Sequence, residues 1–173
     1  MKAKLEQQLM VELSRRNIDL ITQWSEENPE SINVLIDMVL SHEDKLAMRA
    51  SWVLEKYSEK YPNCLQERIH EIIDVLNKIP SSSTRRIIAK VLMYHTIPEE
   101  KEGEILNFCI TMLERPKEPV AVKANCMTIV FNLLPKYPDL KNEIFTIIED
   151  QIPYHSVGFK SRFNVLKRRL KQA

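Results

Sequence analysis

Apolar residues recur along the chain at the three- and four-residue spacing of amphipathic helices. The pattern begins at Leu5 and Leu9 and continues almost to the C-terminus, and Trp24 and Trp52 fall on it, where we expect core anchors. Such a spacing buries one stripe of each helix against a neighbour. No segment alternates strictly between apolar and polar residues, as a half-buried strand does, so the pattern predicts an all-α chain. Ten helices are predicted, near residues 5–13, 18–24, 32–40, 43–60, 63–79, 82–94, 98–114, 118–134, 138–151 and 156–171.

Proline residues divide this helical pattern into segments of nearly constant length. Proline lacks an N–H group and fixes φ, so it is found at helix starts or just beyond helix ends. Six of the nine prolines recur at intervals of 18 or 19 residues: Pro62, Pro80, Pro98, Pro116, Pro135 and Pro153. Two helices of about 14 residues with short turns then form a unit of about 36–37 residues, which is in the range of helical repeats.

Each predicted repeat has one small residue at the same place, on one face of the first helix of its pair. These residues are Ala50, Ala89, Ala124 and Ser161, and they are spaced by 39, 35 and 37 residues. Small residues let a neighbouring helix approach closely, as stacking of repeats requires. The sequence therefore predicts a solenoid of about four to five antiparallel helix pairs that forms a single domain over residues 1–173. Within it, residues 1–41 are expected to be an N-terminal cap or a degenerate repeat, and residues 154–173 a basic C-terminal capping helix.

One of these stripes resembles the first helix of a HEAT repeat. Arg86, Ala89 and Met93 stand at the spacing of that motif, whereas Ala47 and Ala121 replace the arginine that the family often has. Over residues 30–173 the chain is similar to HEAT-like (ARM-type) helical repeat proteins, including short bacterial ones. The resemblance implies a right-handed α-α superhelix (solenoid) that acts as an interaction scaffold, and it implies little about chemistry.

Composition narrows the range of functions. The chain has only two glycines, Gly103 and Gly158, and phosphate-binding loops need several at fixed spacing. Cys64, Cys109 and Cys126 are odd in number and lie among apolar residues, which predicts buried free thiols in a reducing compartment. The sequence has no apolar run of the roughly 18 residues that span a bilayer and no apolar leader. We therefore expect a cytoplasmic protein with no membrane partner.

Spacings typical of catalytic or metal sites are absent from the sequence. His42, His70, His95 and His155 are scattered, one in each region, so we expect them to be surface or partly buried residues and predict no metal and no cofactor. No cysteine adjoins a histidine on one helix face, and no nucleophile elbow occurs. We therefore expect a non-enzymatic protein. A HEAT-like DNA glycosylase, or another enzyme whose site is assembled in three dimensions, remains an alternative.

Charge is distributed unevenly, although the formal net charge is only +1. The second helices of three pairs, in residues 62–79, 98–115 and 138–152, sum to −1, −3 and −3. The first helices, in residues 43–61, 81–97 and 116–137, sum to 0, +3 and +2. Second helices of HEAT-like arrays usually line the concave face, so that face is expected to be acidic. This disfavours the glycosylase, because bound nucleic acid needs a basic groove.

The predicted C-terminal helix is the candidate binding site. It carries six cations and no acid: Lys160, Arg162, Lys167, Arg168, Arg169 and Lys171. Its apolar stripe, Phe159, Phe163, Leu166 and Leu170, is expected to dock on the preceding helix pair, leaving the cations on two flanks. These cations indicate either a solvated cap or a docking surface for an acidic partner. We expect a protein partner, with nucleic acid as the alternative. An acidic row and a basic end could also meet in a homodimer, so the oligomeric state stays open.

Overall fold

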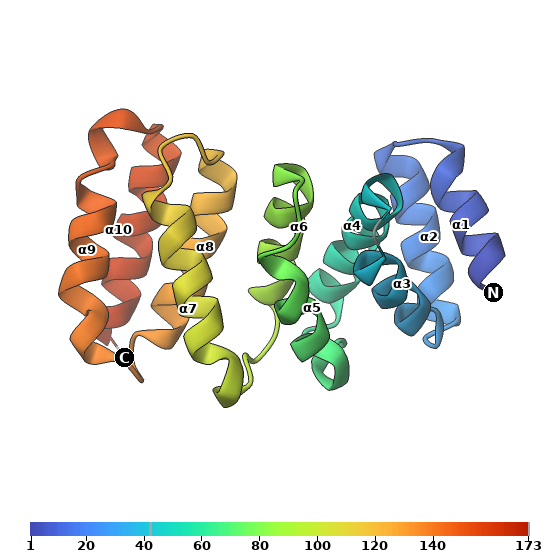
Figure 1. The fold of residues 1–173 in the computed structure, drawn as a ribbon, viewed down its shortest axis with the longest axis horizontal. Coiled ribbons are helices and arrows are strands. Elements are labelled where there is room, and N and C mark those ends of the chain that lie inside the picture. The colour runs from blue at the N-terminus through green and yellow to red at the C-terminus, as the bar shows by residue number, and fades with distance from the viewer. Residues whose placement is uncertain (42, 173) are drawn as a thin grey trace. The chain divides into compact units, whose positions relative to one another are not determined.

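The computed structural model describes residues 1–41 and 43–172, and in this part of the chain it is all-α. Ten α-helices and three short 3-10 helices follow one another, without a strand among the described residues (Figure 1). The α-helices are α1 (Lys2–Val11), α2 (Arg15–Glu27), α3 (Ser31–Leu40), α4 (Asp44–Lys60), α5 (Ile69–Leu76), α6 (Ser82–Leu92), α7 (Glu99–Glu114), α8 (Val120–Leu133), α9 (Lys141–Glu149) and α10 (Val157–Gln172). The prediction of an all-α chain built from helix pairs is confirmed.

Two helices begin later than the sequence predicts. The helix predicted near residues 63–79 begins only at Ile69, after a turn and the 3-10 helix η1 (Gln66–Arg68). Asn63 causes this delay, because its φ of 62° is left-handed and does not continue into a helix. Similarly, Pro138 opens the 3-10 helix η2 (Pro138–Leu140) ahead of α9. A third 3-10 helix, η3 (Ile152–Tyr154), precedes α10.

The chain divides into two compact units, residues 1–98 and residues 99–173. In unit 1, α4 packs against α2, α3 and α6, and α3 packs against α5. Figure 1 shows α3 and α5 in one layer of this unit, with α4 and α6 behind them. In unit 2, α8 packs against α7 and α10, and α7 packs against α9, which gives the same two-layer arrangement. The helices of each layer are therefore alternate helices in the chain, as antiparallel pairs require.

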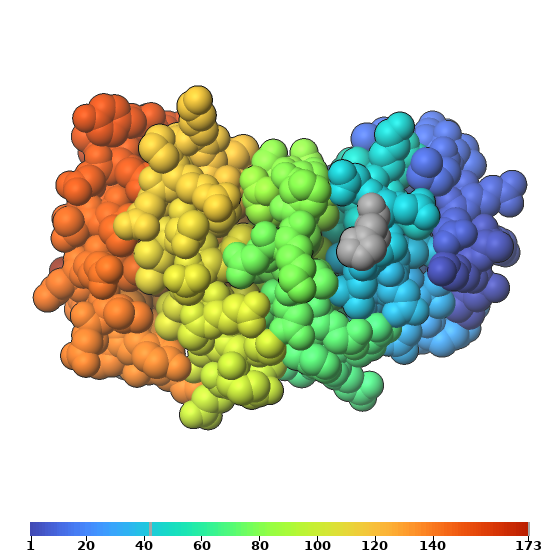
Figure 2. Space-filling view, in the orientation of Figure 1, coloured from blue at the N-terminus to red at the C-terminus, as the bar shows by residue number. Residues whose placement is uncertain are grey.

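Each unit has its own core, and the space-filling view in Figure 2 shows the helices of each unit closely packed. Ala50 and Ala89 of the predicted small-residue stripe are fully buried, so the contacting helices α4 and α6 approach closely there. Trp24 and Trp52 are only half-buried, which corrects the prediction of core anchors. Trp24 lies at the α1–α2 end of the unit, where the Nζ atom of Lys4 lies 5.6 Å from its ring centroid.

Whether the two units unfold together can be measured with the two tryptophans, because both lie in unit 1. Their fluorescence reports unit 1 alone, whereas far-UV circular dichroism reports helices of both units. If residues 1–173 form a single domain, as the continuous repeat predicts, the two signals will show the same urea midpoint. Midpoints that differ would mean that each unit is a separate folding domain.

Candidate functional site

Helix α10 is held on unit 2 by its apolar stripe. Phe159, Phe163 and Leu166 are buried, and α10 packs against α8, as the sequence predicts. The ring of Phe163 meets Phe131 of α8 edge-on at 5.9 Å and Phe145 of α9 at 5.5 Å. Such edge-to-face contacts fix the rotation of the helix about its own axis. The cations of α10 are therefore presented from a fixed surface.

Two of the six cations bind to the body of unit 2. The Nζ atom of Lys167 lies 2.9 Å from Oε1 of Glu149 and 5.2 Å from the ring centroid of Phe163. The guanidinium of Arg162 donates to Oγ1 of Thr128 on α8 at 3.0 Å, which leaves its charge uncompensated. The predicted six-residue patch is therefore partly used in packing α10.

The remaining cations have no counter-charge. Lys160, Arg169 and Lys171 are exposed, and they form no ion pair with any described residue. Arg168 is also exposed, and its Nε atom donates only to the carbonyl oxygen of Asn164, at 3.3 Å. An acidic ligand could therefore approach these four residues without displacing an internal carboxylate.

A groove of about 300 Å³ lies on α10 and is lined by two of its six cations. Arg162 and Arg169 line it together with Gly158, Ser161, Val165 and Leu166. Ser161 is exposed, whereas its counterparts on α4 and α6, Ala50 and Ala89, are buried. Tyr154 and Val157, which precede Gly158 in the sequence, are 83% and 85% exposed. This face of α10 therefore combines the half-buried side chain of Val165 with two arginines.

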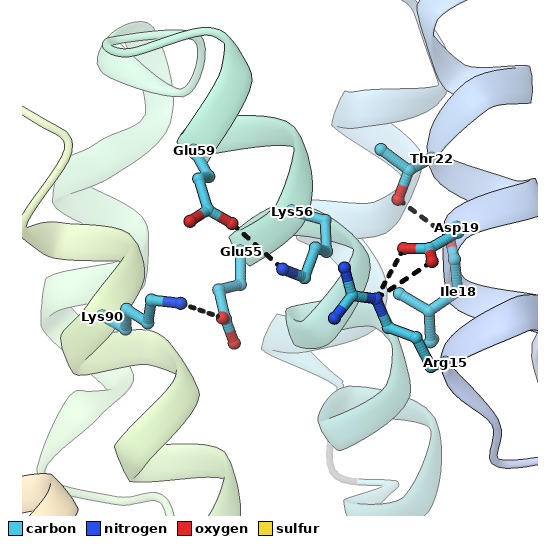
Figure 3. Close-up of polar contacts among 8 residues, drawn as sticks. All are labelled: Arg15, Ile18, Asp19, Thr22, Glu55, Lys56, Glu59 and Lys90. Atoms are coloured by element: carbon cyan, nitrogen blue, oxygen red, sulfur yellow. Dashed lines mark hydrogen bonds and ion pairs between the residues drawn. The ribbon is translucent and has the colours of Figure 1, made fainter.

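Several cations of unit 1 are arranged differently, because they are paired within the unit. Figure 3 shows ion pairs across α2, α4 and α6: Arg15 with Asp19, Lys56 with Glu59, and Lys90 with Glu55. The hydrogen bond from Lys56 is the main cause of the lowered pKa of Glu59. Paired charges of this kind stabilise their own helices and leave little net charge for a ligand. The acidic row of second helices includes α7, with five acids and one lysine; its place on a concave face stays a prediction.

The structure brings together a cysteine and a histidine that the sequence analysis did not connect. The Sγ atom of Cys64, before η1, lies 3.9 Å from Nε2 of His95, after α6. His95 is buried and Cys64 is half-buried, so both differ from the expected exposure, whereas Cys109 and Cys126 are buried as predicted. The two residues are 31 positions apart, and no spacing rule in the sequence would have paired them.

This pair has the chemistry of a structural contact. The Nε2 atom of His95 accepts from the backbone N–H of Leu65 at 3.1 Å, so Nδ1 carries the proton and donates to the carbonyl of Val91 at 2.9 Å. Burial lowers the pKa of His95 and raises the pKa of the Cys64 thiol. A neutral imidazole and a protonated thiol are the opposite of an activated cysteine nucleophile.

The structure describes two of the other histidines, and they lie in different units. His70 is exposed, His155 is half-buried at the start of α10, and His42 lies outside the described residues. Among the described residues, no group of three or more His, Cys, Asp and Glu side chains is placed to hold a metal ion. No described helix is long and apolar enough to cross a membrane.

Unit 2 contains a buried lysine that the sequence analysis missed. Lys123 of α8 is 1% exposed, and its Nζ atom donates to the carbonyl of Leu113 at 2.9 Å and to Oε1 of Gln151. Burial lowers the pKa of Lys123, against the effect of Glu118. Gln151 in turn donates from Nε2 to the carbonyl of Leu113. The cluster joins the ends of α7 and α9 to α8. Its polar groups hydrogen-bond to one another, so it is a structural contact.

A second buried charge joins α7 to the turn after α8. Glu102 is 3% exposed and accepts hydrogen bonds from Nζ of Lys136 at 2.8 Å and from the hydroxyl of Tyr137 at 2.7 Å. These bonds, chiefly the one from Lys136, lower the pKa of Glu102. One of the acids of α7 is thus used inside unit 2.

Comparison with known proteins agrees with the repeated helix pairs. Residues 5–169 match a family model described as a HEAT repeat domain. Neither the curated proteins nor the solved structures gave a match. The family match extends through α1 and α2, beyond the residues 30–173 that carry the resemblance in the sequence.

Proposed function

Because the chain belongs to the HEAT repeat family, we propose that it is a non-enzymatic scaffold that binds a protein partner through its helix surfaces. Repeat proteins of this kind present rigid, extended faces on which side chains hold fixed positions. The docking site is α10, and its occupant is an acidic segment of the partner protein. The unpaired cations Lys160, Arg169 and Lys171 carry this proposal. The three free cysteines support a cytoplasmic location.

The charge of α10 exceeds what helix capping explains. Cations in the last turn of a helix are favourable by about 0.3–1 kcal/mol each, because they complement the negative end of the helix dipole. Arg169 and Lys171 are placed in this way. Lys160, however, lies in the first turn of α10, where a positive charge opposes the dipole. A solvated cap alone therefore leaves Lys160 unexplained, whereas an acidic ligand along the whole helix would use it.

The groove on α10 favours a helical segment as the part of the partner that binds. Gly158 and Ser161 leave room for an apolar side chain, and Arg162 and Arg169 are positioned for carboxylates beside it. An amphipathic helix meets such a groove with anchors at a three- to four-residue spacing. The partner segment is therefore proposed to be an acidic amphipathic helix.

Nucleic acid is the second candidate, because phosphates would meet the same cations. Each neutralised phosphate lowers the slope of log K against log salt by about 0.7–0.9, so four contacts give a slope near −3. The ion pairs of Figure 3 neutralise three cations of unit 1, which then add little basic surface for a longer nucleic acid. We therefore propose an acidic protein, ahead of nucleic acid, as the partner that binds α10.

The test compares affinity capture from source-cell lysate by three forms of the full chain. The first is wild type, and the second is Lys160→Gln/Arg169→Gln/Lys171→Gln. The third is the matched control Lys45→Gln/Arg16→Gln/Lys117→Gln, which removes the same charges from exposed positions outside α10. Three exposed contacts at about 0.2–1 kcal/mol each predict roughly tenfold weaker capture by the α10 variant only.

Each outcome of this experiment decides between the candidates. A nuclease-resistant protein held by wild type and control but lost by the α10 variant supports the scaffold. Captured material that disappears on nuclease treatment moves nucleic acid to first place. Equal capture by all three forms would mean that α10 is only a cap, and the proposed docking site would be wrong.

A further inference from the structure

Exposed apolar side chains gather at the α1–α2 end of unit 1. Nine large apolar side chains are exposed among the described residues, and five of them lie within the first 20 residues: Met1, Met10, Val11, Leu13 and Leu20. Helix α2 packs against α1 and α4, and Figure 1 shows α1 and α2 together at the end of the unit. This end therefore exposes apolar surface of the kind that a binding partner covers.

A groove of about 270 Å³ lies between α1 and α2. Its lining comes from one face of each helix: Lys4, Leu5, Gln8, Leu20, Ile21 and Trp24. Leu5 and Ile21 are buried, which makes the bottom of the groove apolar, whereas Leu20 is 53% exposed. An apolar side chain from a second molecule would bury area here, and burial favours binding in proportion to that area.

One stripe of α2, next to this groove, faces away from the core of unit 1. It consists of Arg16, Leu20, Gln23 and Glu27, which follow one another at spacings of four, three and four residues and are all exposed. Two helices that pack along a common seam have their contact residues at this spacing, and each contact residue enters a hole between four residues of the facing helix. The stripe therefore has the pattern of a helix–helix contact, although its four residues face solvent.

The two ends of this stripe carry opposite charges that unit 1 does not compensate. Arg16 lies in the first turn of α2 and Glu27 is its last residue, so both charges oppose the helix dipole. Their neighbours Arg15 and Glu26 form ion pairs within the unit. Arg16 and Glu27 form no ion pair with any described residue. A partner that fits the stripe would therefore carry an anion opposite Arg16 and a cation opposite Glu27.

We propose that this face binds a second copy of the chain, with the two α2 helices antiparallel. Arg16 and Glu27 lie equally far from the middle of the stripe, so a twofold axis there places each Arg16 beside Glu27 of the other copy. In the same register, Leu20 enters a hole of four residues on the other copy. That hole is formed by Leu20, Gln23, Trp24 and Glu27. The dimer is independent of the partner proposed for α10.

The charges favour a second copy over a partner of another kind. Two ion pairs across the twofold axis compensate all four charges at the ends of the two stripes. A partner of uniform charge, in contrast, would compensate Arg16 or Glu27 but not both. The face is thus complementary to itself, which is what a symmetric interface requires.

The size of the face predicts a weak dimer. Helix α2 has 13 residues and is therefore about 20 Å long, and a pair of helices is about 20 Å wide. The face then covers roughly 400 Å² in each copy, which is less than a standard protein interface and typical of a transient one. We therefore expect monomers and dimers in exchange, with a dissociation constant in the micromolar range.

Sedimentation equilibrium of the full chain tests for this dimer. Between about 1 and 500 μM we expect the mean mass to rise from that of one chain towards that of two. Leu20→Glu should weaken association at least tenfold, because it places a charge in the apolar hole. Leu20 is 53% exposed, so this variant is expected to stay folded by circular dichroism. A chain that stays monomeric over the whole range would overturn the proposal.

Charge reversal tests the antiparallel register. Arg16→Glu brings two pairs of like charges together in its own dimer, and Glu27→Arg does the same with the opposite sign. Each variant alone should therefore associate at least tenfold more weakly than wild type. Mixed in equal amounts, the two variants should form a heterodimer, because every pair is then again of opposite sign. The double variant Arg16→Glu/Glu27→Arg should also dimerise, within about threefold of wild type.

Lys45→Glu is the matched control, because it reverses an exposed charge of unit 1 outside the stripe and the groove. It should leave the dissociation constant within about twofold of wild type. Arg16→Glu and Glu27→Arg replace charges that oppose the helix dipole, so loss of folding would not explain their weaker association. If both variants dimerise as tightly as wild type, or if their mixture stays monomeric, the two copies do not meet in this register and the proposal fails.

Discussion

Replacing Lys123 with alanine should lower the free energy of unfolding by about 2–4 kcal/mol. The lysine is 1% exposed, so its replacement by alanine leaves a cavity where three methylenes and the ammonium were packed. It also removes the donor to the carbonyl of Leu113 and to Oε1 of Gln151. The measurement is a urea titration followed by far-UV circular dichroism, which reports the helices of both units and therefore includes those of unit 2.

Lys123→Met is the matched control for this substitution. Methionine keeps most of the side-chain volume and removes the ammonium, so we expect a loss of less than about 1.5 kcal/mol. Burial lowers the pKa of Lys123 from 10.5, so above that lowered value the unfolded chain holds more protons than the folded one. Wild type should therefore gain stability relative to Lys123→Met as the pH rises towards 10.5. Losses for alanine and methionine that are equal and below about 0.5 kcal/mol would show that the ammonium lies in water.

Acid should destabilise unit 1 through His95. Burial lowers the pKa of this imidazole from 6.5, and its Nε2 atom, which a proton would occupy, accepts from the N–H of Leu65. Below pH 6.5 the unfolded chain therefore binds a proton that the folded chain does not. The stabilising contribution is present above pH 6.5 and is lost as the pH falls towards the folded pKa, at up to about 1.4 kcal/mol per pH unit.

His95→Gln isolates this effect, because the amide oxygen of glutamine keeps an acceptor for Leu65 but does not titrate. We expect the stability of wild type to fall relative to that of His95→Gln between pH 6.5 and 5. Urea unfolding followed by tryptophan fluorescence reports unit 1, since Trp24 and Trp52 both belong to it. The carboxylates are common to both proteins, so they cancel in the difference. Parallel pH profiles would mean that His95 takes up its proton freely in the folded chain.

The sequence determined the helices of this protein because local periodicity sets them. The apolar spacing and the prolines gave ten helices close to their observed positions, and Ala50 and Ala89 were rightly placed at close helix contacts. The docking stripe of α10 was predicted for the same reason, since Phe159 and Phe163 lie four residues apart on one face. The predicted start of α5 was wrong because the backbone of Asn63 is left-handed.

Tertiary structure decided the contacts between residues that no local spacing links. The contact of Cys64 with His95 spans 31 residues, and the burial of Lys123 depends on Gln151, 28 residues further on. A helical period fixes which face of a helix is buried, but the polar partners on that face come from other helices. For this protein, the sequence determines the elements and the stacking stripes, and packing alone determines which polar groups meet.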